Sequence, residues 1–374
     1  MNYLILSSFG QVMSYIGYIA LAILILLVMI TVHELGHYIA GKIFKFGIDE
    51  FAIGFGPKIF SRKKKNGELF SVRLFPIGGF CAFRGEDDDS DDPTAFNNKK
   101  WWQRIIVLIS GAFMNYLLAL ITIIVMFSFY GQTTLVAFKM QDRPAEISEE
   151  YCFQEKDIIL SSNGKNIYLL TDLMDLVKGR EKGELVDFTV RRAGKEMDIK
   201  VELRTSTHFE NVEDVSELYS ALGIYHQADN EGRIVDGGMY STSVRFGFFE
   251  TIARSFEYSF IIAGTIFTVL GQLITGALGI GALGGTVTTI AVTADVIKIG
   301  GLRQLLNMTS FIGVNLAVFN LLPFPALDGS RVVFTAIEGV RKKPLNRRIE
   351  GLIHTIGLFA LLLFAVIVDL QQCF

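Results

Sequence analysis

Long stretches without a charged residue constrain this chain more than any other feature of its sequence. About 20 apolar helical residues cross the hydrocarbon layer of a membrane, and each of these stretches is long enough to do so. Over the 374 residues, 51% are hydrophobic and only 20% are charged. The sequence therefore predicts a polytopic α-helical membrane protein and excludes collagen-like, disordered and disulfide-stapled classes. The charge-free windows are 1–32, 105–138, 258–294, 304–327 and 351–368.

Basic residues predict how the helices are oriented. The segment that follows a first helix over about 15–43 is rich in Lys and Arg, including the run Arg62–Lys65. The positive-inside rule places such a segment in the cytoplasm, so the amino terminus is expected outside. A second helix over about 105–130 then returns the chain to the outside.

The window 258–277 is ambiguous. If it crossed the membrane, the next helix, about 308–327, would deliver the basic loop 331–348 to the outside, against the positive-inside rule. We therefore expect 258–277 to be interfacial or re-entrant. The last helix, about 351–368, completes a predicted total of about four transmembrane helices.

The middle of the chain differs from both ends. Residues 139–245 carry many charges of both signs, strand-like runs and turn dipeptides such as Asn163-Gly164, which are typical of a small water-soluble α/β domain. We expect a first membrane half over 1–138, an extracytoplasmic domain over 139–245 and a second membrane half over 246–374.

A short alternating run precedes the second helix. Residues 70–86 alternate apolar and polar positions around Pro76 and a pair of glycines, which predicts a bent β-hairpin or loop against the membrane. The edge of such a loop can pair with an extended substrate by strand addition. This interpretation assigns substrate contacts to Gly79, Phe80 and Cys81. The alternative is a hairpin that only anchors the fold.

The sequence His33-Glu34-Leu35-Gly36-His37 ends the first apolar helix. Positions i and i+4 lie on one face of a helix, so both imidazoles can bind one ion, and this spacing is typical of zinc metalloproteases whose Glu is the general base. A charge at the centre of a span costs about 2.5–3.5 kcal/mol. That cost favours a metal site over the alternative of packed polar residues.

Asp328 is the candidate for a third ligand, because a catalytic zinc usually has three protein ligands and an open position for water. It lies in the segment NLLPFPALDG, residues 320–329, at the end of another charge-free window. The two prolines of this segment break a helix and free backbone carbonyls at a point where water must enter. Alternatively, Asp328 only terminates a helix beside Gly329.

These motifs, in this order, resemble the site-2 protease family of intramembrane zinc metalloproteases, in its bacterial regulator-of-sigma-E-protease branch with a PDZ domain. The resemblance covers nearly the whole chain: HELGH at 33–37, RLFPIGGF at 73–80, FNNKKWWQR at 96–104 and NLLPFPALDG at 320–329. It implies Zn²⁺ bound by His33, His37 and Asp328, a general-base role for Glu34, and contact of Asn320 with the substrate or its oxyanion.

The resemblance also implies a location and partners. It places the chain in the bacterial cell membrane, with the lipid bilayer around it and a PDZ-like fold for 139–245. It implies a single-pass membrane protein as substrate, such as an anti-sigma factor or a signal-peptide remnant, and an upstream site-1 protease that cuts the same substrate. Tyr151-Cys152-Phe153 stands where the family has Ala-Gly-Leu, so no peptide-binding groove is assigned.

Two other functions are compatible with parts of the sequence. A non-catalytic relative would bind membrane clients with the same helices, but Glu34 and the full ligand set argue against it. A metal transporter also places His and Asp at membrane depth, but it predicts internal pseudo-symmetry and a second half-site, which are not apparent. The formal net charge of −3 gives no reason to expect nucleic acid.

Overall fold

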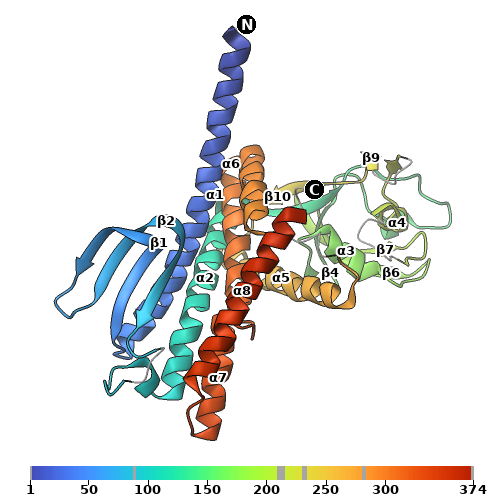
Figure 1. Ribbon diagram of the computed structural model, residues 1–374. Helices are drawn as coiled ribbons and strands as arrows, with labels where there is room; N and C mark the ends of the chain where they lie inside the picture. The colour runs from blue at the N-terminus through green and yellow to red at the C-terminus, as the bar shows by residue number, and fades with distance from the viewer. Residues whose placement is uncertain (1, 87–89, 209–214, 230–233, 280–283, 372–374) are drawn as a thin grey trace. The chain divides into compact units, whose positions relative to one another are not determined.

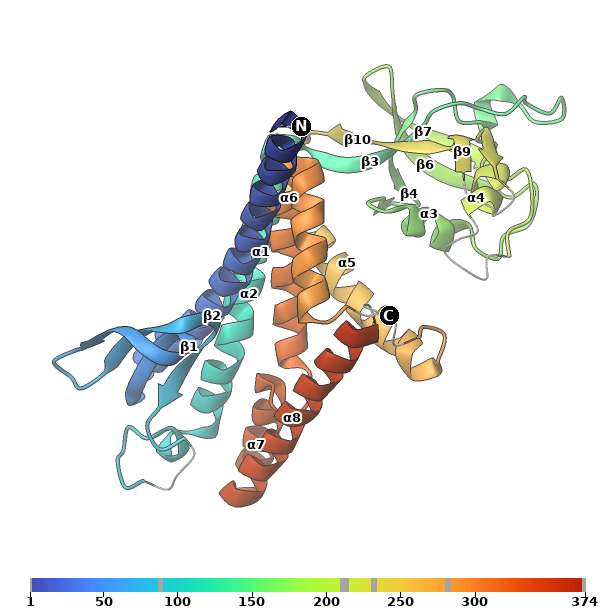
Figure 2. The same cartoon turned by 45° about the horizontal axis from the view of Figure 1, so that its top comes forward.

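The computed structural model describes residues 2–86, 90–208, 215–229, 234–279 and 284–371 (Figures 1 and 2). They form two compact units. Unit 1 comprises Met1–Val125 and Ser255–Phe374, and unit 2 comprises Met126–Arg254. The helices and strands of the membrane halves are α1 (Asn2–Ile43), β1 (Ile48–Lys63), β2 (Leu69–Phe83), α2 (Trp101–Tyr130), α5 (Phe248–Thr275), α6 (Thr286–Leu321), α7 (Asp328–Arg341) and α8 (Arg347–Gln371).

Within the described residues, four helices are long and apolar enough to cross a membrane: Val12–Ile43 of α1, α2, α5 and α8. The chain is thus a polytopic membrane protein with the predicted number of candidate spans. One member of the set differs from the prediction. By length and composition α5, which contains the segment expected to be interfacial, is a candidate span, whereas α6 is not.

The predicted helix over 308–327 was wrong at both ends, because it is the second part of the longer helix α6. Gly301 divides α6 with a φ of 58°, in the left-handed region that favours glycine. The helix ends at Leu321, two residues before Pro323, as the loss of a backbone donor at proline requires. Polar side chains such as Asn307 and Asn315 make this part of α6 less apolar than the four candidate spans.

Glycines set how closely the helices of unit 1 approach. Figures 1 and 2 show α1, α2 and α6 running side by side. A Cβ atom on Gly36 of α1 would lie 2.3 Å from the backbone oxygen of Ser110 on α2. A Cβ on Gly313 of α6 would lie 2.9 Å from Ala119 and 3.1 Å from Met29. Such close packing, rather than the hydrophobic effect, holds helices together in a membrane.

The β-structure of unit 1 is larger than the predicted hairpin. β1 pairs with β2, and residues 50–53 of β1 each have two partners, one in 79–82 and one in 69–72. Residues 79–82 therefore form an outer strand of this sheet. The sequence prediction missed β1, because its Gly, Lys and Pro residues do not alternate clearly with apolar ones.

A buried carboxylate ties this sheet to the end of α1. Glu68 is 2% exposed, and its oxygens lie 2.5 Å from Lys42 Nζ and 2.9 Å from Lys64 Nζ. Burial opposes ionisation of Glu68, but hydrogen bonds from Lys42, Lys64 and Asn66 lower its pKa to about 2. The contact fixes the sheet beside the helix that carries the HELGH motif.

Unit 2 is built on one antiparallel sheet with the strand order β10-β3-β4-β6-β7 and β5 beside β4. Its core gathers buried apolar side chains from the sheet, such as Phe188, and from two short helices, such as Leu173 and Leu218. The strand β3, which pairs with β10, extends this unit beyond the predicted start at residue 139. Its elements are β3 (Gln132–Ala137), β4 (Ile158–Ser162), β5 (Lys165–Asn166), α3 (Leu170–Val177), β6 (Leu185–Arg192), β7 (Lys195–Glu202), α4 (Val215–Ala221), β8 (His226–Ala228), β9 (Ile234–Gly237) and β10 (Met239–Val244).

Candidate metal centre

His33 and His37 face each other one turn apart on α1. Both are buried, at 8% and 7% exposure, and their ring centroids lie 4.7 Å apart in an edge-to-face arrangement. Their Nε2 atoms are 3.1 Å apart. The i, i+4 spacing therefore brings the two imidazoles together as the sequence predicted.

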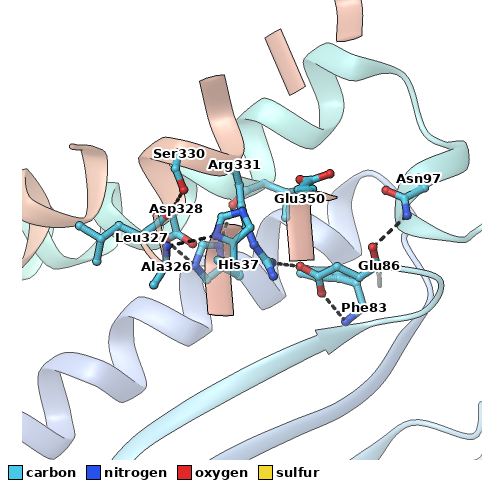
Figure 3. Close-up of polar contacts among 12 residues, drawn as sticks. His37, Phe83, Glu86, Asn97, Ala326, Leu327, Asp328, Ser330, Arg331 and Glu350 are labelled. Carbon is cyan, nitrogen blue, oxygen red and sulfur yellow. Dashed lines mark hydrogen bonds and ion pairs between the residues drawn. The ribbon is translucent and has the colours of Figure 1, made fainter. Parts of the chain in front are cut away.

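Asp328 joins them from the first residue of α7 (Figure 3). Its Oδ2 atom lies 3.0 Å from His33 Nε2 and 3.2 Å from His37 Nε2. Gly329 makes this approach possible, because a Cβ there would lie 2.3 Å from the backbone oxygens of Leu321 and Leu322 at the end of α6. The Asp-Gly pair thus places one carboxylate where the two helices meet.

A hydrogen bond sets the tautomer of His37. Its Nδ1 atom lies 2.8 Å from the backbone oxygen of Val107 on α2, and a carbonyl can only accept. Nδ1 therefore carries the proton, and Nε2 of the neutral ring presents a lone pair toward Asp328 Oδ2. That oxygen is itself buried and makes no hydrogen bond within the described residues. A cation held between this oxygen and the two Nε2 atoms would compensate the buried carboxylate charge.

The three ligand atoms have the spacing of a tetrahedral metal site. His33, His37 and Asp328 each offer one atom, and all three atoms lie within 4.8 Å of one another. Two ligands bound tetrahedrally at 2.0–2.1 Å from zinc lie about 3.3 Å apart. The observed separations of 3.0–3.2 Å are close to that value, so the residues fit the ion that the sequence predicted.

The backbone of α2 closes one side of the centre. A Cβ on Gly111 would lie 2.4 Å from His37 Nε2 and 2.7 Å from His33 Cε1. Only glycine leaves room for both imidazoles at this point. Together with Val107, Gly111 makes α2 the wall behind the two histidines.

Glu34 lies beside this centre and against β2. Its carboxylate faces the backbone N–H of Cys81. A Cβ on Gly79 would lie 3.4 Å from Glu34 Cγ. The outer strand of the sheet therefore runs past Glu34. The side chain of Phe80 instead stacks on Phe55, with ring centroids 6.3 Å apart.

Asn320 reaches the centre from α6, close to its end. Its Nδ2 atom lies 3.4 Å from His33 Nδ1. The structure thus places Asn320 against the ring nitrogen of His33 that faces away from Asp328.

A model of peptidase family M50 matches residues 21–364. The chain belongs to peptidase family M50. The zinc metalloprotease RasP of Bacillus licheniformis is 30% identical over 440 residues, covering 94% of this chain and 98% of that protein. RasP of Geobacillus kaustophilus is 27% identical over 428 residues, covering 92% and 96%. A Clostridium perfringens protein with a provisional zinc metalloprotease name is 34% identical over 358 residues, covering 95% and 98%.

Two further contacts hold the Asp328 segment of this M50 family member. Arg331 of α7 forms an ion pair with Glu86, just beyond β2 (Figure 3). The backbone N–H of Ala326 donates to His354 Nδ1 of α8 at 3.1 Å. His354 is thus a hydrogen-bonded residue that supports the loop before Asp328. Sequence reasoning missed all four contacts around the ligands, namely those of Val107, Gly111, Glu86 and His354, because each joins residues far apart in the chain.

Proposed function

We propose that this member of family M50 is an intramembrane zinc endopeptidase of the site-2 protease type. The observation that carries the proposal is the convergence of His33 Nε2, His37 Nε2 and Asp328 Oδ2 beside a carboxylate that is not itself a ligand. Relatives named zinc metalloproteases over almost the full chain support the same metal. The three convergent residues would hold Zn²⁺.

Glu34 is the proposed general base. A bound zinc ion supplies a Lewis acid that polarises the scissile carbonyl and lowers the pKa of water. Glu34 would take the proton of the attacking water and pass it to the leaving amine. The backbone N–H of Cys81 faces the Glu34 carboxylate and would orient it for this proton transfer.

Asn320 has a proposed double role. A carboxamide can present either its oxygen or its nitrogen, and with the oxygen toward the ring it accepts the Nδ1–H of His33. This bond would leave His33 Nε2 as the ligand atom, as Val107 does for His37. The amide nitrogen of Asn320 then remains for the substrate backbone or its oxyanion, as the family resemblance implies.

The substrate is proposed to be a single-pass membrane protein, cut within or at the edge of its transmembrane segment. The ligands belong to α1, a candidate span, and to the segment that follows α6. Peptide bonds within a helix are shielded by their own hydrogen bonds, so the substrate must be extended to react. The outer strand of the sheet, with Gly79 and Cys81 beside Glu34, can hold an extended segment by main-chain pairing.

The proposed location is the bacterial cell membrane, with the amino terminus outside and the basic loop 331–348 in the cytoplasm. Unit 2 would then lie outside. We propose that it is a PDZ-like domain that admits a substrate only after an upstream protease has removed its bulky outer part. Such exclusion depends only on the size of the substrate's outer part and needs no peptide-binding groove.

The decisive experiment compares wild type with Glu34→Gln and Asp328→Ala. The amide of Glu34→Gln cannot accept a proton but leaves the ligands intact, so cleavage of a model membrane substrate should fall by at least about a hundredfold while zinc stays bound. Asp328→Ala should lose zinc and activity together, measured by elemental analysis of purified protein. Turnover of Glu34→Gln at a tenth of the wild-type rate or more would contradict the role of Glu34.

A further inference from the structure

A cavity lies where α2 and α8 begin, apart from the metal centre. Its volume is about 850 Å³, and it is formed by the start of α2, the end of α7 and the turn into α8. Six lining residues are basic and one is acidic, which gives a formal net charge of +5. The basic residues are Lys99, Arg104, Lys342, Lys343, Arg347 and Arg348.

The single acid, Glu338, neutralises only the inner part of the cavity. Its Oε2 lies 2.6 Å from Arg104 Nη1, and its Oε1 lies 2.9 Å from Arg347 Nη2 and 2.8 Å from the backbone nitrogen of Leu345. Lys342, Lys343 and Arg348 are exposed and form no ion pair with any residue that the structure describes. The outer part of the cavity therefore carries three uncompensated cations.

Arg104 supplies a buried donor without an acceptor. The residue is 5% exposed, lines the cavity and makes no hydrogen bond from Nε within the described chain. An unsatisfied buried donor on a charged group is costly, but Nε has almost no accessible surface and is not open to a ligand. The Arg104 residue as a whole lines the cavity, and guanidinium groups bind phosphate oxygens well.

The cavity lies at the level of lipid headgroups. Both helices that begin there, α2 at Trp101 and α8 at Arg347, are candidate spans, so their first residues mark one boundary of the membrane. Trp101 lines the cavity and is 49% exposed, as expected of an aromatic residue at the interface. Val340 and Ile349, at 85% and 57% exposure, present apolar surface beside it.

We propose that this cavity binds the phosphate-bearing headgroup of an anionic phospholipid, with Lys342, Lys343 and Arg348 as the recognising cations. Basic pockets between membrane helices at the cytoplasmic side bind such headgroups in other proteins. The apolar surface beside the cavity favours a lipid, whose acyl chains would cover it, over free phosphate. The site is independent of the metal centre and of the proposed peptidase activity.

The two tryptophans of the chain provide a direct test. Both, Trp101 and Trp102, lie at this end of α2, so all tryptophan fluorescence reports on the neighbourhood of the cavity. We expect the tryptophan fluorescence of the full-length protein in phosphatidylcholine vesicles to be quenched more by brominated phosphatidylglycerol than by brominated phosphatidylcholine at equal mole fraction. Each cation near a membrane surface contributes about fivefold to the binding of an anionic lipid.

The triple variant Lys342→Gln/Lys343→Gln/Arg348→Gln should lose the preference for phosphatidylglycerol. The matched control Arg62→Gln/Lys63→Gln/Lys65→Gln removes three exposed cations from the end of β1 and the turn after it and should keep the preference. Equal quenching by both lipids in wild type, or an equal loss in both variants, would overturn the proposal. If inorganic phosphate, compared with chloride at the same ionic strength, abolishes the preference, the cavity is a free-phosphate site and the lipid assignment is wrong.

Discussion

Gly111 decides whether the two histidines can share one ion. Its α-carbon faces both imidazoles, and a methyl group there would lie 2.4 Å from His37 Nε2, well inside van der Waals contact. Overpacking of this kind typically costs about 1–3 kcal/mol. Because the imidazoles are the groups nearest to the new methyl, they are the groups that must move.

We therefore expect Gly111→Ala to lower zinc content and cleavage together while the protein stays in the membrane. Gly351→Ala is the matched control, since nothing lies within 4 Å of a Cβ at that helical position and alanine is the better helix former. Zinc analysis and a cleavage assay on both purified variants check this. Full zinc occupancy in Gly111→Ala would show that the histidines tolerate the methyl group.

At the scale of single residues, the sequence predicted which candidate ligands come together but not which residues hold them in position. HELGH gives the two imidazoles by helical spacing alone, and Asp328 was found because it is a charge at the end of an apolar window. The supports of the ligands, such as Val107 and His354, depend on which helices pack together. A single sequence does not specify such pairings between residues far apart in the chain.

Among the elements, β2 joins the sheet to the catalytic region. Cys81→Pro removes the N–H that faces the Glu34 carboxylate and leaves every candidate ligand in place. This N–H would donate to Glu34 while the base acts, and a hydrogen bond to a charged group is worth about 1.5–3 kcal/mol, so cleavage should fall by about tenfold or more at unchanged zinc content. Cys81→Ser keeps the N–H and should retain activity. If a folded Cys81→Pro protein cleaved the substrate at the wild-type rate, the sheet would serve only to anchor the fold.

The sequence predicted the long apolar helices better than the elements between them. The predicted helix ends at Ile43 and Tyr130 agree with α1 and α2. α6 was predicted too short, because Asp295 and Lys298 interrupt its apolar run. β1 was missed because its pairing with β2, rather than its own composition, makes it a strand.

For the whole molecule, the orientation in the membrane requires introduced cysteines. Cys152 is buried, and burial and the charge of Glu34 raise the pKa of the Cys81 thiol, so these two of the three native thiols react poorly with maleimide. With all native cysteines replaced by serine, an impermeant maleimide added to spheroplasts should label Lys195→Cys. It should not label Lys65→Cys until the membrane is permeabilised. The reverse pattern would invert the proposed orientation.

The same assay decides whether α5 or α6 crosses the membrane. Ala277 follows α5 and is exposed. Labelling of Ala277→Cys in intact spheroplasts, which we expect, means that α5 stays at the outer surface and the second part of α6 crosses. Protection of this cysteine would mean that α5 crosses. In both cases the basic loop 331–348 remains on the cytoplasmic side.

The function of unit 2 can be tested because its ends are adjacent. Gln132 of β3 pairs directly with Val244 of β10, and paired strand residues lie about 5 Å apart, so a linker of about four Gly and Ser residues can replace 133–243. Gln132 is kept because its Oε1 accepts a hydrogen bond from Arg254 at 3.2 Å. The metal ligands lie outside this segment, so the shortened protein should still bind zinc.

If unit 2 excludes bulky substrates, the shortened protein should cleave an untrimmed membrane substrate much faster than wild type does. A pre-trimmed substrate should be cut at a similar rate by both, because its size no longer hinders entry. Rates for the two substrates with both proteins give the answer. Equal cleavage of both substrates by wild type would remove the need for a filter. A shortened protein that binds zinc but cuts neither substrate would show that unit 2 recruits substrates. Its metal centre would be intact, and only the delivery of substrate to it would be lost.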